Sequence, residues 1–369
     1  MDVVALPTSQ TTFDNITQLS GKRLAAAKPS FVTRNVPIEE FHFLVKDDIR
    51  PRAGDIILAR IDKLGQHQRI ELPSGRRAHL FKGDEVIVSY GNRYAPDQFL
   101  GRIPGSLAPC SLVAAGGIAS EVVAKHARMK NATKITPLGF LASHNKKIIN
   151  LQGWQLPQLT SKSTTPMVLA VAGSSMNGGK TTTMAYLARG LVKAGLSVGA
   201  AKITGTGAGV DYWKMIDAGA YPVIDFTDMG YASTYKVDAP KIEAVMERQV
   251  DYLSHQGVDI ILLEIADGLA QLETAPLLQS RLFHSIVDGM FFASAEALSV
   301  QSAVHWIRSH GLPLIGVSGA LTASPMILEE TRQLCPVPVF TKEELGSAEF
   351  HPHLIKLVHE QNLEISNSQ

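Results

Sequence analysis

The chain has 369 residues, of which 45% are hydrophobic and 19% charged, and its formal net charge is +1. This length provides core for two or three domains, and the balanced charge argues against bulk attraction to nucleic acid or to an anionic membrane. The two cysteines, Cys110 and Cys335, stand outside any C-x-x-C pattern, which argues against a disulfide scaffold or a structural zinc site. No signal peptide is recognisable, and no apolar run approaches the ~20 residues of a membrane helix. We therefore expect a cytoplasmic protein.

The N-terminal half predicts a β-rich domain. Residues 1–36 are polar and mixed in character, and they predict an N-terminal extension. Across 37–157, short apolar runs such as 55–61 alternate with turn residues, a texture typical of a small antiparallel barrel or sandwich. Within this domain a helix is expected at 121–129. The run 158–166 is polar and ends in proline, which predicts a linker.

After the linker, across 167–369, apolar strands alternate with helical segments. The expected strands cover 167–173, 197–203, 221–226, 258–265, 287–294, 313–319 and 337–341. The expected helices lie near 180–194, 211–219, 239–256, 296–310 and 325–335. Near-continuous apolar strands separated by helices predict an α/β domain with a parallel sheet that is covered on both faces. Ligands of such sheets bind at the edge where the carboxyl ends of the strands meet.

The segment 167–183, MVLAVAGSSMNGGKTTT, predicts a phosphate-binding loop between a strand and a helix. Glycines let backbone N–H groups approach phosphate oxygens, and the N-terminus of the helix adds partial positive charge. Lys180 would reach the outer phosphates, and the Thr181 hydroxyl would bind Mg²⁺. The alternative is a tight strand–helix turn with an incidental lysine. The expected nucleotide-binding residues are Gly173, Ser174, Asn177, Gly178, Gly179, Lys180, Thr181 and Thr182.

Three charged residues fall near the same predicted edge. Lys202 ends the second strand and could neutralise a transferring phosphate, although a solvated lysine is the alternative. Asp211 begins the next helix and could hold Mg²⁺, or it could only cap the helix. Glu264 ends a buried strand, where an unpaired carboxylate is costly and a Mg²⁺ ligand or water-orienting group is expected.

Two turns of the N-terminal domain carry arginine, at 75–77 and at 91–94. If these turns face the predicted edge, they could bind an acidic substrate or a phosphate. The alternative is that both are hairpin turns with solvated side chains. The sequence alone leaves the two readings open.

Residues 165–345 resemble the dethiobiotin synthetase-like branch of SIMIBI-type P-loop ATPases. Members of that branch have a lengthened loop before GKT, and here five residues separate Gly173 from Gly179. They also carry a lysine twenty-two residues after the loop lysine, which is the spacing of Lys202 from Lys180, and a strand-ending glutamate like Glu264.

The resemblance implies roles for these residues. Lys180, Lys202 and Glu264 become catalytic, Thr204 and Thr206 become substrate contacts, and the metal ligands become Thr181, Asp211 and Glu264. The family's acidic residue three positions before the loop lysine is Asn177 here, and the N-terminal half has no counterpart in the family.

The expected function is that of an ATP- and Mg²⁺-dependent enzyme that activates a small-molecule carboxylate or amine by phosphoryl transfer, as a ligase or synthetase does. The alternative is a nucleotide-dependent switch or chaperone ATPase or GTPase that acts on a protein partner. The expected partners are a nucleotide and a small molecule, with a possible homodimer and no nucleic acid or membrane.

Overall fold

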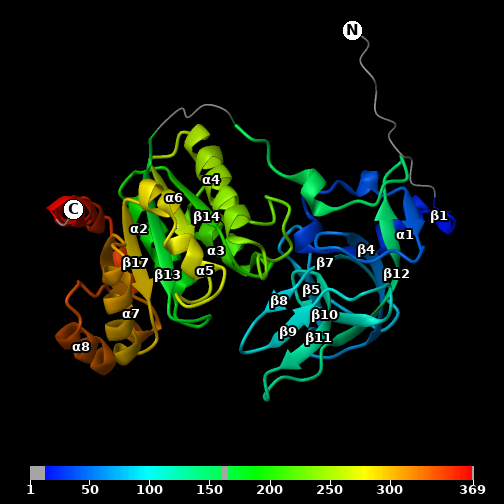
Figure 1. Ribbon diagram of the computed structural model, residues 1–369, viewed down its shortest axis with the longest axis horizontal. Coiled ribbons are helices and arrows are strands. Elements are labelled where there is room, and N and C mark those ends of the chain that lie inside the picture. The colour runs from blue at the N-terminus through cyan, green and yellow to red at the C-terminus, as the bar shows by residue number, and fades with distance from the viewer. Residues whose placement is uncertain (1–12, 160–164, 368–369) are drawn as a thin grey trace, which may run out of the picture.

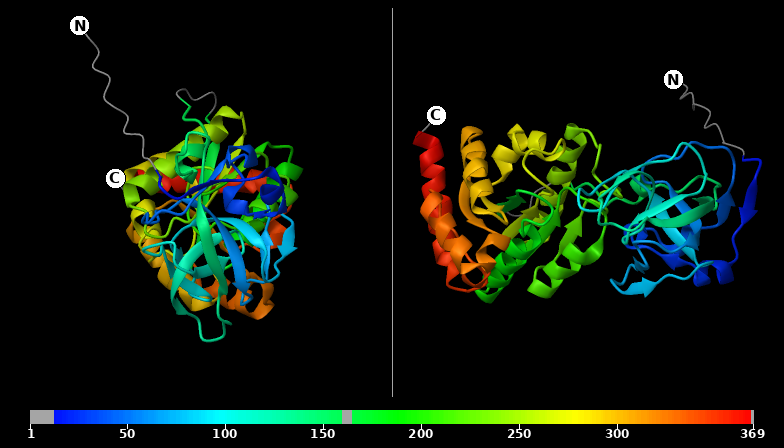
Figure 2. Two further views of the ribbon diagram at one scale, coloured as in Figure 1. Left: turned by 90° about the vertical axis from the view of Figure 1, so that its right-hand side faces the viewer. Right: turned by 90° about the horizontal axis from the view of Figure 1, so that it is seen from below.

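The computed structural model describes residues 13–159 and 165–367, which form two domains side by side (Figure 1). The β-rich N-terminal domain and the α/β C-terminal domain meet along one side of each, as the views from other directions also show (Figure 2). The first twelve residues of the predicted extension and most of the predicted linker, 160–164, lie outside the described residues. None of the helices in the described ranges combines the length and the apolar character needed to cross a bilayer.

The N-terminal domain is built on a ten-stranded, mostly antiparallel sheet with separate apolar cores, which confirms the predicted β-rich fold. Its central path runs β1-β3-β12-β4-β7-β11-β9-β8, and β10 and β2 pair at the side. The strands are β1 (Ile16–Gln18), β2 (Lys28–Pro29), β3 (Phe43–Val45), β4 (Ile56–Lys63), β7 (Glu85–Tyr90), β8 (Arg93–Tyr94), β9 (Phe99–Arg102), β10 (Cys110–Ala114), β11 (Ile118–Lys125) and β12 (Thr133–Ala142). A separate hairpin joins β5 (Arg69–Glu71) to β6 (Arg77–His79).

Two predictions for this domain are corrected by the pairing of its strands. The helix expected at 121–129 is instead the second half of β11 and a turn, because Val122 and its neighbours pair antiparallel with β9. β-branched residues such as Val122 and Val123 favour this extended pairing. Residues 16–36 are not an extension, because β1 pairs with β3, β2 pairs with β7, and Phe31 is fully buried. The short helix α1 (Gly21–Ala26) connects β1 to β2, and η1 (Phe31–Thr33) follows β2 in the chain.

The C-terminal domain contains a six-stranded parallel sheet in the order β15-β14-β16-β13-β17-β18, which confirms the predicted α/β class. Its strands are β13 (Met167–Gly173), β14 (Val198–Lys202), β15 (Val223–Asp225), β16 (Ile260–Glu264), β17 (Gly289–Ala293) and β18 (Leu314–Ser318). Two apolar cores pack against the sheet. β13 lies in the middle, and its neighbour β16 pairs with β14 so that Lys202 lies opposite Glu264.

The helices of this domain follow the predicted alternation with additions. They are α2 (Lys180–Lys193), α3 (Gly209–Ala218), α4 (Ala239–His255), α5 (Thr274–Leu278), α6 (Arg281–Ile286), α7 (Ala297–Ser309), α8 (Pro325–Leu334), α9 (Lys342–Leu345) and α10 (Phe350–Asn367). The strand expected at 337–341 is replaced by a single parallel bridge between Val317 and Val339. Pro336 and Pro338 have no N–H to donate, which limits pairing there.

The N-terminal domain packs against loops that follow β14 and β15, at the carboxyl end of the parallel sheet. Glu71 accepts a hydrogen bond of 2.9 Å from the backbone N–H of Gly209, and Gln152 donates one of 2.8 Å to the carbonyl of Gly230. The centre of this contact is Arg34, whose Nη2 lies 2.7 Å from Asp228 and 3.3 Å from Asp225. The two domains therefore meet directly beside the predicted ligand edge.

The Arg34 contact is a buried ion network. Its guanidinium side chain is 9% exposed and stacks 4.0 Å from the centre of the Phe31 ring. Burial opposes ionisation of Arg34, yet Asp225 and Asp228 outweigh that effect and raise its pKa. Burial raises the pKa of Asp228, although Arg34 opposes this. The network thus depends on the guanidinium to hold two buried carboxylates.

Replacing Arg34 with methionine should lower the free energy of unfolding by about 3–5 kcal/mol, because two buried carboxylates would lose their cation. Urea unfolding followed by circular dichroism measures this change. The matched control is Arg60→Met, which removes an arginine that is 50% exposed and pairs with Asp62, itself 31% exposed. That substitution should cost only about 0–1 kcal/mol. Equal losses in both variants would show that the Arg34 network does not stabilise the domain contact.

Candidate functional site

The loop between β13 and α2 follows a path that only small residues permit. A Cβ added to Gly173 would lie 2.8 Å from the carbonyl oxygen of Ala293, and one added to Gly178 would lie 2.9 Å from the same oxygen. Gly179 has φ +96° and touches the backbone of Gly319, so a side chain there would be both strained and crowded. The glycines thus seat the loop against the carboxyl ends of β17 and β18. Its backbone stays close to the start of α2, as a phosphate-binding loop requires.

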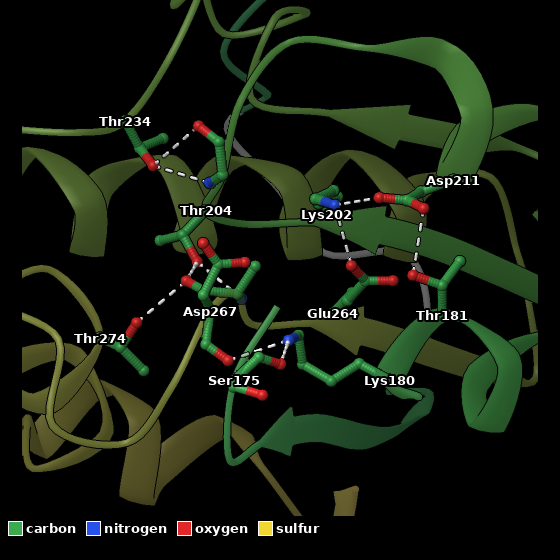
Figure 3. A network of polar contacts seen from close by, with 12 residues as sticks. Ser175, Lys180, Thr181, Lys202, Thr204, Asp211, Thr234, Glu264, Asp267 and Thr274 are labelled. Carbon is green, nitrogen blue, oxygen red and sulfur yellow. Dashed lines mark hydrogen bonds and ion pairs between the residues drawn. The ribbon is translucent and has the colours of Figure 1, made fainter. Parts of the chain in front are cut away.

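Lys180, the first residue of α2, reaches back across this loop (Figure 3). Its Nζ donates hydrogen bonds of 2.7 Å to the carbonyl of Ser175 and 2.9 Å to the carbonyl of Asp267. The residue is only 3% exposed, and burial lowers its pKa, although Glu264 and Asp267 oppose that shift. Its ammonium group therefore lies between the loop and the turn after β16, at the predicted position of the outer phosphates.

Thr181, Lys202, Asp211 and Glu264 form one connected network (Figure 3). The Lys202 ammonium lies between the two carboxylates, in contact with Asp211 and 2.9 Å from Glu264 Oε1. Asp211 also accepts a hydrogen bond of 3.1 Å from the Thr181 hydroxyl. The structure therefore brings together the predicted catalytic lysine and all three predicted metal ligands.

The charges in this network stabilise one another. Burial disfavours the charged form of Lys202, but Asp211 and Glu264 outweigh it and raise the lysine pKa well above its usual range. Burial likewise opposes ionisation of Asp211, yet Lys202 and Thr181 lower its pKa. At neutral pH the network thus contains an ammonium ion beside a carboxylate, both in their charged forms.

The donor set at this position fits Mg²⁺ bound together with a nucleotide. Mg²⁺ in such sites takes one or two carboxylates, waters and phosphate oxygens, at bonds of about 2.0–2.1 Å. Adjacent ligands of an octahedron with those bonds lie about 3 Å apart, close to the 3.1 Å between Thr181 Oγ1 and Asp211 Oδ1. In the described part of the chain no cluster of three or more His, Cys, Asp or Glu residues could hold a metal.

The two predicted substrate threonines have different surroundings. The Thr204 hydroxyl is buried, donates to the carbonyl of Ala266 at 2.5 Å and accepts from the Ala266 N–H at 2.9 Å. These bonds join the turns after β14 and β16, and the role of Thr204 as a substrate contact stays a prediction. Thr206 instead lines a cleft between the domains, beside Asp267. It remains a predicted substrate contact.

The other predicted nucleotide contacts lie around the loop. Ser174 donates its N–H to the carbonyl of Ala293 at 3.0 Å, so its backbone fastens the loop to β17. Asn177 is exposed and lies 3.5 Å from Asp97 of the N-terminal domain. The Thr182 hydroxyl accepts a hydrogen bond of 2.8 Å from Lys214 of α3. These contacts are the observed surroundings of the three residues. Their roles in nucleotide binding stay predictions.

The arginine turns of the N-terminal domain both reach the C-terminal domain. The turn at 75–77 lies against Trp213 of α3, where a Cβ on Gly75 would come within 2.6 Å of the indole. Arg93 is buried and donates a hydrogen bond of 2.9 Å to Gln98, so it is not a solvated turn residue. Its neighbour Tyr94 lines the same cleft as Thr206. The turn at 91–94 therefore faces the site edge.

Sequence reasoning missed functional candidates that come from the second side of this cleft. Tyr235 and Glu273 line it, and neither belongs to a motif. Arg34 was also missed, because it sits in the segment predicted as an extension. Asp225 and Asp228, at and just after the end of β15, have Arg34 as their cation partner. No signal in the sequence identified that partner.

Several solved structures are similar to part of this chain. No family model matches the chain, and no curated protein matches it. Among solved structures, chloroplast FtsY from Physcomitrella patens matches with a TM-score of 0.36 and 18% identity, over 52% of this chain and 63% of that one. The signal recognition particle receptor FtsY from Elizabethkingia anophelis in complex with GDP matches with a TM-score of 0.33 and 18% identity, over 50% and 59%.

A third match is the signal recognition particle 54 kDa protein from Aeropyrum pernix in complex with GDP, with a TM-score of 0.35 and 18% identity, over 58% of this chain and 52% of that one. The chain thus spans less than two thirds of the length of each of these structures. The C-terminal domain has the fold of a P-loop NTPase, as the parallel sheet, the glycine loop and α2 establish. These matches do not name a dethiobiotin synthetase, so that finer resemblance stays a prediction.

Proposed function

We propose that this protein binds a magnesium–nucleoside triphosphate at the loop 173–181 and transfers or releases its terminal phosphoryl group beside the contact between the domains. The observation that carries the proposal is the meeting of Lys180, Lys202 and Glu264 at one sheet edge (Figure 3). Each comes from the end of a different element, and no simple structural role requires them together. ATP is the nucleotide predicted from the sequence, and GTP enters the tests because two similar structures hold GDP.

Each residue of the site would have a distinct role in such a reaction. The loop amides and Lys180 would hold the polyphosphate, so that binding places it beside Lys202. Lys202 would stabilise negative charge that develops on the transferring group, in a site where burial strengthens its field. Thr181 and Asp211 would hold Mg²⁺, which neutralises phosphate charge when bound. Glu264 would fix Lys202 and orient an attacking group.

In the favoured form of this proposal, the acceptor is a small molecule with a carboxylate or an amine. The cleft lined by Thr206 and Tyr94 lies beside Asp267, whose carbonyl accepts the Lys180 hydrogen bond. A molecule in this cleft would therefore lie close to the predicted phosphates. Because Tyr94 of the N-terminal domain lines a cleft that is otherwise formed by the C-terminal domain, the N-terminal domain would contribute to the choice of substrate.

A second candidate is a nucleotide-dependent switch that acts on a protein partner. The Arg34 network favours this candidate, because it joins the N-terminal domain to the end of β15 near the nucleotide edge. A change at that edge could then alter the domain contact. Hydrolysis assays with ATP and GTP discriminate the two. Turnover that requires a small molecule supports the enzyme, whereas slow turnover that a protein partner accelerates supports the switch.

Replacing Glu264 with glutamine should lower Mg²⁺-dependent turnover by about 100-fold, because the charged partner that orients Lys202 is lost. Nucleotide binding without Mg²⁺ should change little, since Glu264 does not reach the loop amides in this network. Steady-state phosphate release and fluorescent-nucleotide titration measure the two quantities. Glu247→Gln on the exposed side of α4 is the control. Unchanged turnover in Glu264→Gln would remove this residue from the mechanism.

A further inference from the structure

The space between the domains continues beyond the phosphate edge. A cavity of about 360 Å³ is lined by Gly54, Asn92 and Gln152 on one side and by the segment 230–241 on the other. Tyr235 lines this cavity and also the narrower cleft that contains Thr206 and Asp267. Tyr235 therefore lies where the 360 Å³ cavity meets the cleft that contains Thr206 and Asp267. The cavity is large enough for the body of a small molecule, and the cleft lies close to Lys180.

Glu273 is the unusual residue of the cleft. It is 5% exposed, and its Oε1 accepts a hydrogen bond of 2.6 Å from the Lys236 N–H. Its second oxygen, Oε2, is buried and has no hydrogen-bond partner among the residues that the structure describes. A buried carboxylate oxygen without a partner is costly in free energy, so a missing partner is implied.

The surroundings of Glu273 indicate the charge of that partner. Two other buried carboxylates of this edge have cations, since Lys202 pairs with Glu264 and Arg34 pairs with Asp225. No ion pair to Glu273 is found within the described ranges, and its charged neighbour is Asp267, another carboxylate. Burial raises the pKa of both groups, although Lys180 and Lys202 oppose the shift at Asp267, so a cation beside Glu273 would favour the charged form of its carboxylate.

The aromatic side chains of the cleft suit the same kind of ligand. The rings of Tyr94 and Tyr235 lie 5.4 Å apart, one from each domain. The Arg102 guanidinium already stacks 5.6 Å from the centre of the Tyr235 ring, so this ring has a cation as a neighbour. Tyrosine faces attract ammonium groups as well as guanidinium groups.

We propose that the cleft binds the ammonium group of an aliphatic amine between Glu273 and Asp267, with the rest of the molecule in the 360 Å³ cavity. This inference rests on the proposed function, because it chooses an amine rather than a carboxylate as the small molecule. The ammonium would donate to the free oxygen of Glu273 and replace the missing partner. Tyr235 would separate the charged end of the ligand from its body.

The test uses three probes of nearly equal size on the full chain: n-butylammonium, butyrate and 1-butanol. Saturation-transfer NMR reports their binding without any need for turnover. We expect n-butylammonium to bind and butyrate not to bind. Glu273→Gln should weaken n-butylammonium binding by about tenfold, because an ionic hydrogen bond is lost. Glutamine retains an oxygen that can accept the hydrogen bond from the Lys236 N–H, so we expect the local structure to be preserved.

The matched control is Glu247→Gln, an exposed residue of α4 outside both cavities, which should leave n-butylammonium binding unchanged. Asp267→Asn should weaken it in the same direction as Glu273→Gln. Failure of n-butylammonium to bind, a preference for butyrate, or equal binding by the wild type and Glu273→Gln would each overturn the proposal. Fluorescent-nucleotide titration of the same samples tests the phosphate loop separately. If the nucleotide binds and n-butylammonium does not, the amine proposal fails. If n-butylammonium binds and the nucleotide does not, the proposed function fails.

Discussion

Replacing Lys180 with alanine should weaken binding of the nucleoside triphosphate by at least about 100-fold, the largest effect on affinity that we expect. The substitution removes a buried ammonium from the point where the loop meets the turn after β16. Charge-assisted hydrogen bonds contribute about 1.5–3 kcal/mol each, and this lysine is placed to make more than one to phosphate oxygens. Fluorescent-nucleotide titration or calorimetry measures the change.

Lys193→Ala provides the matched control for Lys180→Ala. Lys193 ends the same helix, is exposed, and donates a hydrogen bond to the carbonyl of Gly346. Its loss should change affinity by less than about twofold, since it lies some thirteen residues, or roughly 20 Å, along α2 from the loop. Retained affinity in Lys180→Ala would mean that the loop 173–181 is a structural turn and not a phosphate site.

The sequence predicted the strand, glycine turn and helix around 167–193 well because these residues are neighbours in the chain. Strand, glycine turn and helix are contiguous, so the register of Lys180 against the loop follows from chain order alone. Lys202 and Glu264 were predictable for a related reason, since carboxyl ends of parallel strands must share one edge. The pairing of Lys202 with Glu264 across adjacent strands then follows from the strand order.

The N-terminal domain was harder to predict because its pairing is not local. The segment at 121–129 contains helix-favouring residues beside Val122 and Val123, and pairing of its first half with β9 decides its conformation. Residues 16–36 look polar in sequence, yet Phe31 and Val32 are buried where this segment meets β7 and the C-terminal domain. The hydrophobic pattern of so short a segment does not indicate which distant strands or domains the segment packs against.

The residues between the domains could not be predicted at all as a group. Arg34, Tyr94 and Glu273 lie in unrelated segments, and their meeting depends on how two folded domains pack. The surroundings of Thr204 were equally hidden, because its hydroxyl bonds the backbone of Ala266, which lies 62 residues further along the chain. Chain order does not reveal such a non-local bond.

Lys202 is expected to matter more for turnover than for nucleotide affinity, and Lys202→Met tests this. Methionine retains an aliphatic stem but removes the charge that faces the transferring group, so turnover should fall by about 1,000-fold. Nucleotide affinity should stay within about tenfold, because Lys180 and the loop amides still hold the phosphates. Equal losses of turnover and affinity would assign Lys202 to nucleotide binding instead.

The same variant should also reveal how the two carboxylates behave without their cation. Asp211 and Glu264 would remain together, Glu264 almost fully buried, so the free energy of unfolding should fall by about 3–5 kcal/mol without Mg²⁺. Added Mg²⁺ should restore part of that loss in Lys202→Met, since a cation can then occupy the space between them, whereas the wild type should gain little. Lys241→Met, which removes the exposed partner of Asp238, should show neither effect. A Lys202→Met protein as stable as the wild type, with or without Mg²⁺, would mean that the ammonium is not what holds these carboxylates together.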